Sequence, residues 1–455
     1  MDKVTEDRTQ ADLTRALARS VIALRYDELP ATVRELARQC ILDYLGVALA
    51  GAQDPLVRIL LDEMAEAGGS SQASIIGHSA RLPMLSAAMV NGSAAHALDY
   101  DDVNMAMPGH PSVAILPGLL ALAELKGSSG REVVTAFVAG YETCCCIGAA
   151  LQPGHYNLGF HSTGTIGCFG AAAACARLLG LDAEATAMAL GIAGTQAAGL
   201  KSQFGTMCKP FHAGKAAQNG LLAARLAQRG FSSRTDIVEC VQGFALTHGP
   251  DFAPEAARAS PEAGFHLLAN LFKYHAACYF THAPIECARR LRVEHRLTPE
   301  VIAGITLRLD ASCDRVCNIA VPVDGLQSKF SLRQTVAMAL AGIDTASLGA
   351  YSAENARDPG LVGLRERMRF DWQKNWPQTL SELELELVDG RRLTDRHDAG
   401  IPAADIAEQG NRLAAKFDVL VTPVLGAPRA RELRQMIFGL DNVADIRNLT
   451  RLAAV

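Results

Sequence analysis

Apolar positions in the first half of the chain recur at the spacing of an α-helix. Residues 31–50 place their apolar side chains on one helical face. Residues 164–179 and 183–198 are rich in Ala and Gly and carry few charges, as closely packed buried helices do. Gly180 follows the first of these helices at the position where a C-terminal cap favours glycine. The pattern predicts that residues 11–265 form one helix after another.

The pattern changes to a period of two after about residue 266. Residues 305–310 and 382–387 alternate apolar and polar side chains, as half-exposed β-strands do. A tight-turn signal at residues 389–390 allows residues 391–396 to return as a partner strand. Helical patterns between these strands lie at residues 331–340 and 361–368.

The length of the chain predicts two domains. A single core stops growing at roughly 250–300 residues, and this chain has 455. The segment 404–452 is helical again and is expected to rejoin the first domain. We therefore expect a mainly α protein in which residues 1–265 and 404–455 form a large helical-bundle domain. Residues 266–403 are expected to form a smaller α+β domain.

Charge and composition limit the partners to be expected. The formal net charge is −5, with 49% hydrophobic and 20% charged residues, which is ordinary for a globular enzyme and argues against a nucleic-acid or acidic-membrane partner. No segment offers the roughly 18 uninterrupted apolar residues of a membrane span. Residues 112–125 come closest, and residues 1–10 lack an apolar signal core. We expect a cytoplasmic protein. Because the net charge is negative, an anionic ligand would have to be bound by cations at the site itself.

The twelve cysteines are expected to be structural thiols. No Cys-x-x-Cys pair occurs, and the three consecutive cysteines at 144–146 would point in different directions on a helix. Cys313 and Cys317 have the spacing of a ligand pair, but no second pair accompanies them. We therefore expect no iron–sulfur cluster, no other metal and no cofactor.

The first segment that carries chemistry runs from His96 to Ser112. Three carboxylates and two imidazoles fall within fifteen residues of it, in a stretch broken by Pro and Gly. Carboxylates and histidines in one loop make a candidate acid–base set. The alternative is a polar loop in which Ser112 or Asp102 caps the next helix.

The second segment, residues 159–165, directly precedes an Ala-rich helix. Backbone N–H groups and hydroxyls at a helix N-terminus make a site for an anion such as a carboxylate. The alternative is ordinary helix capping by Thr163 or Thr165.

The third segment, residues 204–215, contains a lysine in apolar surroundings. Lys209 stands directly before Pro210, where a solvated lysine is unusual, and a buried lysine needs an anionic partner. That anion is either a substrate or Asp99. The alternative is a lysine that extends to the surface.

Two further segments are weaker signals. Phe272-Lys273-Tyr274-His275 stands where the second domain begins, and Gln327-Ser328-Lys329-Phe330-Ser331 enters a helix. A lysine on an exposed turn is the alternative explanation for each.

Taken together, these segments resemble the MmgE/PrpD family, whose members include 2-methylcitrate dehydratase, cis-aconitate decarboxylase and iminodisuccinate epimerase. The similarity runs over nearly the whole chain, with the matching segments in the expected order. The segments that carry it are His96–Asp102, His110–Ser112, Gly159–Gly164, Gly205–Gly214 and Phe272-Lys273.

The resemblance implies a large helical domain built from both chain ends, a smaller α+β lid domain and a site in the cleft between them. It also implies a homodimer without a metal. The positions that match the family's active-site residues are Asp99, His110, His161, Lys209 and Lys273. The residues that we further expect to bind the substrate are Tyr156, Thr163, Lys329 and Ser331.

The family's reactions build negative charge on a carbon beside a carboxylate. We expect Lys209, Lys273 and His161 to bind the carboxylates as a clamp of cations. We expect His110 to act as the general acid or base, with Asp99 orienting it or sharing the proton. Two positions depart from the family. Gln334 stands where the decarboxylase branch has a Tyr, and Cys146 stands where an Arg is frequent.

The expected activity is therefore that of a lyase. Dehydration of a small polycarboxylate, as in 2-methylcitrate dehydratase, is the leading hypothesis. Epimerisation or isomerisation of a dicarboxylate such as iminodisuccinate is the runner-up. Decarboxylation and a non-catalytic carboxylate-binding dimer are the remaining alternatives.

Overall fold

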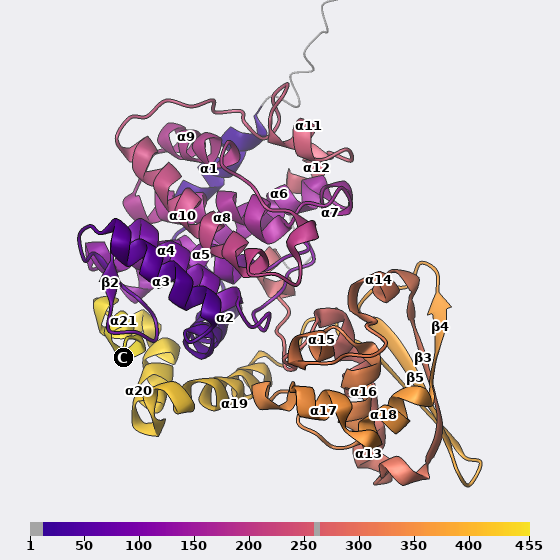
Figure 1. Cartoon of the computed structure of the whole chain (residues 1–455). Helices are drawn as coiled ribbons and strands as arrows, with labels where there is room; N and C mark the ends of the chain where they lie inside the picture. Colours follow the sequence, from indigo (N-terminus) through magenta and orange to yellow (C-terminus); the bar gives the residue numbers. More distant parts are fainter. Residues whose placement is uncertain (1–11, 259–263) are drawn as a thin grey trace, which may run out of the picture. The chain divides into compact units, whose positions relative to one another are not determined.

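The computed structural model describes residues 12–258 and 264–455, which divide into two compact units (Figure 1). Unit 1 consists of Met1–Asn270 and Ala404–Val455, and unit 2 of Leu271–Ala403. Helices dominate the described residues, and a small mixed sheet lies in unit 2. The expected fold class, mainly α with a smaller α+β part, is confirmed.

Unit 1 extends to Asn270 because specific hydrogen bonds hold its last segment. The Glu142 carboxylate accepts the backbone N–H groups of His266 and Leu267, both at 2.9 Å. The Asn270 side chain accepts a hydrogen bond from the Tyr141 hydroxyl at 2.6 Å. Residues 266–270 therefore belong to the helical unit and not to the α+β unit.

Unit 1 is built from helices that the apolar pattern predicts. The predicted helix at 31–50 is α2, and the Ala/Gly-rich helices at 164–179 and 183–198 are α8 and α9. The unit's elements are α1 (Leu13–Ala23), α2 (Ala31–Gly51), α3 (Pro55–Ala67), β1 (Ala73–Ser74), β2 (Arg81–Leu82), α4 (Met84–His96), α5 (Pro111–Lys126), α6 (Gly130–Leu151), α7 (Gly154–Asn157), α8 (Ser162–Leu179), α9 (Ala183–Gly194), α10 (Cys208–Gln228), α11 (Phe244–His248), α12 (Pro254–Arg258), α19 (Ile406–Leu425), α20 (Ala427–Phe438) and α21 (Arg447–Ala453).

Small residues let the central helices cross closely. A Cβ atom at Gly214 of α10 would lie 2.1 Å from the Met89 carbonyl oxygen of α4, so only glycine fits there. A Cβ atom at Gly220 would lie 2.4 Å from the Ala171 methyl of α8. Helix α10 is thus held against both α4 and α8, and the ends of these helices carry the candidate site residues.

Helix α6 is the segment with the most membrane-like composition. It is long and apolar enough to cross a membrane by length and composition alone, so the expectation that residues 112–125 come closest is wrong. In the structure, 83% of the apolar window of α6 is buried within the protein. Burial in a core accounts for this apolar sequence without a membrane.

The C-terminal helices pack onto the first helices of unit 1. Helix α19 lies against α2, and the buried Lys416 ammonium contacts the Asp43 carboxylate at 2.6 Å. This contact joins residues 373 positions apart in the sequence. The return of the chain end to the helical unit is therefore an observed feature of the fold.

Unit 2 is a four-stranded sheet with helices. The strand order is β4-β3-β5-β6; β5 pairs antiparallel with β3 and β6, and β4 runs parallel to β3. The pattern predicts β3, β5 and β6, whereas β4 was overlooked although its residues Met368–Gln373 alternate apolar and polar side chains. The helices and strands of unit 2 are α13 (His282–His295), β3 (Ile302–Asp310), α14 (Asp314–Cys317), α15 (Gly325–Lys329), α16 (Leu332–Leu340), α17 (Ala353–Arg357), α18 (Pro359–Glu366), β4 (Met368–Gln373), β5 (Leu380–Leu387) and β6 (Arg392–Asp398).

Candidate active site

The loop between α4 and α5 holds the first group of candidate residues. His96 is the last residue of α4, and His110 occupies the N-cap position of α5, before Pro111 at its first turn. Between them, Asp99 adopts a left-handed backbone conformation, with φ of 51°. Non-glycine residues in this conformation are uncommon, and they occur preferentially at functional sites.

Neither residue proposed to cap α5 does so. The helix has no side-chain cap at its start, and the Ser112 hydroxyl donates instead to the Asp102 carboxylate at 2.5 Å. The interpretation of this loop as a simple capping loop is therefore wrong. The N-cap residue of α5 is His110, and its imidazole contacts Asp101 instead of capping the helix.

Asp101 joins two of the imidazoles. Its carboxylate lies 2.9 Å from His96 Nδ1 and 3.0 Å from His110 Nδ1. Burial raises the pKa of Asp101, but its contacts with the imidazoles of His110 and His96 outweigh burial and hold the pKa well below its usual range, so Asp101 is an anion. Asp101 accepts the Nδ1–H of His96, and the Nδ1–H of His110 donates to the Asp102 carbonyl oxygen at 2.8 Å beside Asp101. A neutral imidazole protonated at Nδ1 has its lone pair at Nε2. Asp101 and the Asp102 carbonyl together therefore make His110 Nε2 a proton acceptor.

The start of α8 provides the next group. His161 is the N-cap residue of this helix, and no side chain caps it. The Thr163 hydroxyl accepts the backbone N–H of His110 at 3.1 Å, and the Thr165 hydroxyl contacts His155 Nε2 at 2.8 Å. Capping by Thr163 or Thr165 is therefore also wrong. Thr163 instead connects the first turns of α5 and α8.

The first turns of α10 complete the cluster. Lys209 and His212 are three residues apart, so they lie on one face of this helix. The Lys209 ammonium contacts Asp99 Oδ1 at 2.7 Å, and His212 Nδ1 lies 3.0 Å from His161 Nδ1. Of the two anions proposed for Lys209, the structure shows Asp99. His212 was not predicted as a site residue. Its spacing of three residues from Lys209 was the signal that could have identified it.

The exposed fractions of the side chains divide the cluster into a partly exposed group and a fully buried group. The side chains of Lys209, His110 and Asp99 are 9%, 12% and 16% exposed. Those of His96 and Asp101 are 0% and 1% exposed. His110 belongs to the partly exposed group, and its Nε2 atom lies 3.8 Å from Asp99 Oδ1. The partly exposed groups of the cluster are thus a lysine, an imidazole and a carboxylate, and the buried Asp101 lies behind the imidazole.

The structure corrects two expectations: which residue orients His110, and whether His161 is a cation. His110 is oriented through Nδ1 by Asp101 and the Asp102 carbonyl oxygen and not by Asp99, which lies 3.8 Å from Nε2, the side on which a proton would be shared. Burial lowers the pKa of His161 well below its usual value, and the neighbouring His96 and Lys209 lower it further. His161 is thus a neutral hydrogen-bonding group, and its expected role as a cation is not supported.

Three helix N-termini meet at this cluster. His110, His161 and Lys209 stand at the starts of α5, α8 and α10, and the contacts of Thr163 and His212 tie these starts together. Each N-terminus carries partial positive charge and N–H groups without helical partners. The arrangement favours an anionic ligand such as a carboxylate.

Four residues of the cluster have the geometry to hold a metal ion. His96, Asp99, Asp101 and His110 each offer one ligand atom, and these atoms lie within 4.8 Å of one another. The Lys209 ammonium, however, already contacts Asp99 and would repel a divalent cation at close range. The donor set therefore fits an acid–base cluster with its own cation better than a metal centre.

Tyr156 lies near the cluster in sequence but is used differently. The Lys201 ammonium stands 3.5 Å from the centre of its ring and donates to its carbonyl oxygen at 3.0 Å. Tyr156 is part of α7 in unit 1. Substrate binding by Tyr156 stays a prediction.

Three expected site residues belong to unit 2. Lys273 is 1% exposed, and the Lys329 ammonium stands 5.8 Å from the ring centre of Tyr351. The Ser331 hydroxyl donates to the Ile319 carbonyl at 2.6 Å and accepts the Gln334 N–H at the start of α16. Ser331 thus has a structural use within unit 2, and substrate binding by Lys273, Lys329 and Ser331 stays a prediction.

The two departures from the family also have structural surroundings. The buried Gln334 side chain donates to the Asn355 carbonyl and accepts from Arg365 at 2.8 Å, so it stabilises unit 2. Cys146 lines a separate cavity of unit 1 together with Glu142 and His266. None of the other residues that line this cavity belongs to the His110 cluster.

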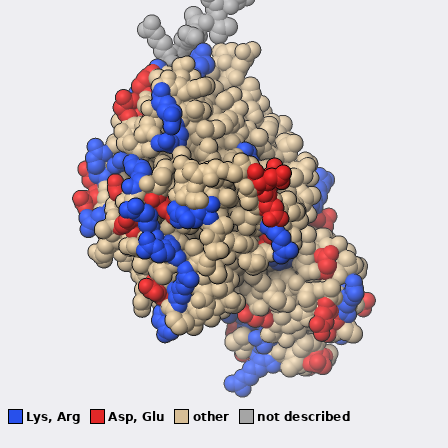
Figure 2. All heavy atoms as spheres, turned by 60° about the vertical axis from the view of Figure 1, so that its left-hand side comes forward, with Lys and Arg blue, Asp and Glu red and all other residues tan. Residues whose placement is uncertain are grey.

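Charge is unevenly spread over the surface. Figure 2 shows one face on which Lys and Arg side chains gather in a band, with Asp and Glu interspersed. The chain as a whole carries a formal charge of −5. Attraction for an anion therefore depends on local features such as the helix N-termini described above.

Comparison with known proteins gives consistent matches along the chain. Residues 15–256 match the MmgE/PrpD N-terminal domain model, and residues 275–442 match the MmgE/PrpD C-terminal domain model. A cis-aconitate decarboxylase of Aspergillus terreus is 26% identical over 98% of this chain and 97% of its own length. Cis-aconitate decarboxylases of Homo sapiens (27%) and Mus musculus (26%) each align with 97% of this chain, over 94% and 93% of their own lengths.

Proposed function

The chain belongs to the MmgE/PrpD family, and we propose that it is a cofactor-independent lyase that acts on a small polycarboxylate. One observation carries the proposal. Two segments far apart in the sequence, the loop between α4 and α5 and the first turn of α10, bring His110, Asp99 and Lys209 to one partly exposed edge. The buried Asp101 and the Asp102 carbonyl fix the proton on His110. Such an edge can bind an anion and move a proton.

The proposed chemistry begins with proton abstraction beside a carboxylate. His110 Nε2 takes a proton from a carbon atom next to a substrate carboxylate, and negative charge then develops on that carboxylate. The Lys209 ammonium and the N-termini of α5, α8 and α10 stabilise this charge. Asp101 stabilises the imidazolium that forms on His110.

Dehydration is the first candidate reaction. In it, the proton leaves one carbon, hydroxide leaves its neighbour, and a carbon–carbon double bond and water result. Gln334 supports this assignment over decarboxylation, because the decarboxylase branch has a Tyr at the corresponding place. The bonds of Gln334 to Asn355 and Arg365 give it a structural task instead.

Decarboxylation of a cis-aconitate-like acid is the second candidate. The observation that favours it is the similarity to cis-aconitate decarboxylases over 97–98% of the chain. Decarboxylation also builds charge beside a carboxylate, so the same helix N-termini and Lys209 would serve it. Epimerisation of a dicarboxylate needs only the proton-transfer half of this chemistry.

One experiment separates these reactions. The protein is incubated in deuterated water with a panel of hydroxy-, amino- and unsaturated di- and tricarboxylates. Alkene formation identifies dehydration, carbon dioxide release identifies decarboxylation, and deuterium in recovered substrate without either identifies epimerisation. Binding of a panel member without any of the three changes would support a non-catalytic carboxylate-binding protein and contradict the proposal.

The assembly and the location of the protein are part of the same proposal. We propose a cytoplasmic homodimer, and we propose that Lys273 and Lys329 also bind the substrate. Light scattering coupled to gel filtration tests the dimer. Lys273→Met and Lys329→Met test the two lysines, and each is expected to raise KM for the substrate that the panel identifies.

A further inference from the structure

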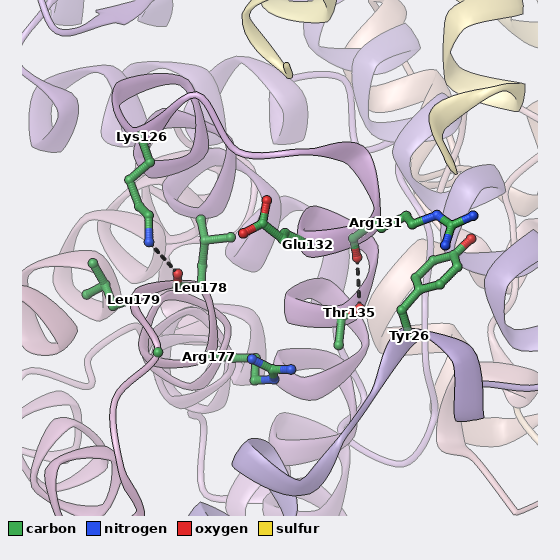
Figure 3. A pocket seen from close by; sticks show the side chains of 9 residues that line it. Tyr26, Lys126, Arg131, Glu132, Thr135, Arg177, Leu178 and Leu179 are labelled. Atoms are coloured by element: carbon green, nitrogen blue, oxygen red, sulfur yellow. Dashed lines mark hydrogen bonds between the residues drawn. The ribbon is translucent and has the colours of Figure 1, made fainter. Parts of the chain in front are cut away.

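A second cavity of unit 1 is lined by basic groups. It has a volume of about 390 Å³, which is within the size range of small-molecule sites. It lies where the C-terminal ends of α5 and α8 meet the first turns of α6 (Figure 3). The residues that line it are Tyr26, Lys126, Arg131, Glu132, Thr135, Arg177, Leu178, Leu179 and Gly180.

The three cations of this cavity have mainly neutral partners. Lys126 Nζ donates to the Leu178 carbonyl at 2.7 Å, as Figure 3 shows, and Arg177 donates to a backbone carbonyl at 2.8 Å. Arg131 donates to a backbone carbonyl at 3.2 Å and stacks 4.9 Å from the Tyr26 ring centre. Its one carboxylate contact is 3.7 Å long and goes to Asp27, whose side chain is 88% exposed.

The single acid in the lining is already engaged. Glu132 Oε2 accepts the backbone N–H of Ser129 at 2.7 Å and its hydroxyl at 2.8 Å, in the capping box that starts α6. The bond to the Ser129 backbone lowers the pKa of Glu132, and the charges of Lys126 and Arg177 lower it further, so Glu132 offsets part of their charge. The lining still carries three positive charges against one negative charge. An excess of cations around a hollow of this size favours an anion.

Arg177 supplies an independent sign of a missing partner. Its Nε atom is shielded from solvent and has no hydrogen-bond partner among the described residues. An enclosed guanidinium N–H without an acceptor is costly, and such groups are normally paired with protein, water or ligand. A ligand oxygen in the cavity would satisfy it.

We propose that this cavity is a binding site for a small organic anion that carries two or more oxyanion charges. The guanidinium groups of Arg177 and Arg131 and the Lys126 ammonium bind the charged oxygens. Leu178, Leu179 and the Tyr26 ring provide the apolar contacts that an inorganic ion would not use. The class includes di- and tricarboxylates and phosphate esters.

This site is distinct from the His110 cluster. Helix α5 has 16 residues and α8 has 18, so at 1.5 Å per residue they are roughly 24 and 27 Å long. His110 and His161 stand at their N-termini, whereas Lys126 and Arg177 stand in their last turns. The same two helices therefore carry a candidate site at each end.

A purely structural role for these cations is the competing explanation. Lys and Arg in the last turn of a helix stabilise it through the helix dipole. That explanation predicts lower stability in the variants but no dependence on an added anion. The proposal predicts a binding signal that these residues control.

The test measures binding by isothermal titration calorimetry in a Lys209→Met background, which weakens anion binding at the His110 cluster. Citrate and glycerol phosphate are the probes, with inorganic phosphate for comparison. We expect one site for at least one organic probe. Arg177→Gln and the exposed Arg131→Gln should each weaken it tenfold or more, and Arg225→Gln, a half-buried arginine on α10, should not.

Two results would overturn the proposal. One is the absence of binding by either organic probe at millimolar concentration. The other is binding that both Arg177→Gln and Arg131→Gln retain. Binding of inorganic phosphate as tight as that of the organic probes would contradict the organic class of ligand. Because Arg131 is exposed, Arg131→Gln keeps the test valid if Arg177→Gln fails to fold.

Discussion

The Lys209 ammonium lies 2.7 Å from Asp99 Oδ1, with 9% and 16% of the two side chains exposed. Asp99 stands in the loop after α4, and Lys209 stands in the first turn of α10. Their contact pairs the lysine with an acid, so removing Lys209 leaves a largely buried carboxylate without its cation. It makes Lys209 both a structural partner and a group within reach of a ligand.

The first prediction separates these two roles. Lys209→Met removes a charge-assisted contact to the substrate and should lower turnover roughly a hundredfold or more. It also leaves Asp99 without its cation and should lower stability by about 1–3 kcal/mol. The double variant Asp99→Asn/Lys209→Met should recover part of the lost stability, measured by thermal unfolding, but not the turnover. Recovery of turnover in the double variant would contradict a catalytic role for the lysine.

The second prediction concerns the proton on His110. Asp101→Asn removes the anion that lies 2.9 Å from His96 Nδ1 and 3.0 Å from His110 Nδ1, while the Asp102 carbonyl oxygen still accepts the His110 Nδ1–H. The charge that stabilises the imidazolium is lost but the tautomer is held in part, so turnover should fall by roughly 10–10³, less than the ~10⁴ seen when a carboxylate is the sole partner of Nδ1. Steady-state kinetics at several pH values check this result. Turnover of Asp101→Asn within a factor of three of the wild type would show that Asp101 does not orient the base.

A third prediction follows from the buried Asp102. Burial and the nearby Asp43 raise its pKa to about 7, although the Ser112 hydroxyl bond opposes the shift. The folded protein therefore binds a proton that the unfolded chain releases near pH 4. The stability that this proton gives is complete below pH 4 and is lost as the pH rises through 7.

Asp102→Asn should remove this dependence. Relative to the variant, the wild type should lose on the order of 2–4 kcal/mol of unfolding free energy between pH 4 and pH 8. Urea unfolding of both proteins across this range measures the difference. A parallel pH dependence of the two curves would show that Asp102 is not the titrating group.

The fourth prediction concerns metal ions. His96, Asp99, Asp101 and His110 have ligand atoms within 4.8 Å of one another, but Lys209 supplies a cation beside them. Activity should survive dialysis against EDTA, and added zinc should inhibit by competing for the imidazoles. A loss of activity with EDTA that a divalent ion restores would assign these four residues to a metal centre.

Much of the fold could be predicted from the sequence. The helical period at 31–50 and the alternation at 382–387 correspond to α2 and β5. The alternation matches β5 because that strand buries its leucines and turns its glutamates outward, whereas α2 is buried on all sides from Gln39 to Leu49. Strand β4 (Met368–Gln373) was missed although its residues alternate, because the helical pattern predicted at 361–368 runs directly into it.

The site was predicted in part. Asp99, His110, His161 and Lys209 were named as site residues, and contacts within unit 1 bring them together. Their partners were harder to predict, because Asp101, Asp99 and Asp102 are close in sequence and only the turn geometry decides which carboxylate faces His110. His212 was missed because its contact with His161 depends on how α10 packs against α8. This packing requires a glycine at position 220 of α10, since a side chain there would meet the Ala171 methyl of α8.

The most direct test of the central claim uses the substrate that the panel identifies. Exchange of its carbon-bound hydrogen with deuterated water is followed by NMR for the wild type and for His110→Asn, alongside substrate binding by calorimetry. If His110 Nε2 is the base, the variant should bind the substrate within about threefold of the wild type but lose exchange and turnover together, by roughly 10²–10⁴. Exchange and turnover near the wild-type rate in a folded His110→Asn protein would contradict the account.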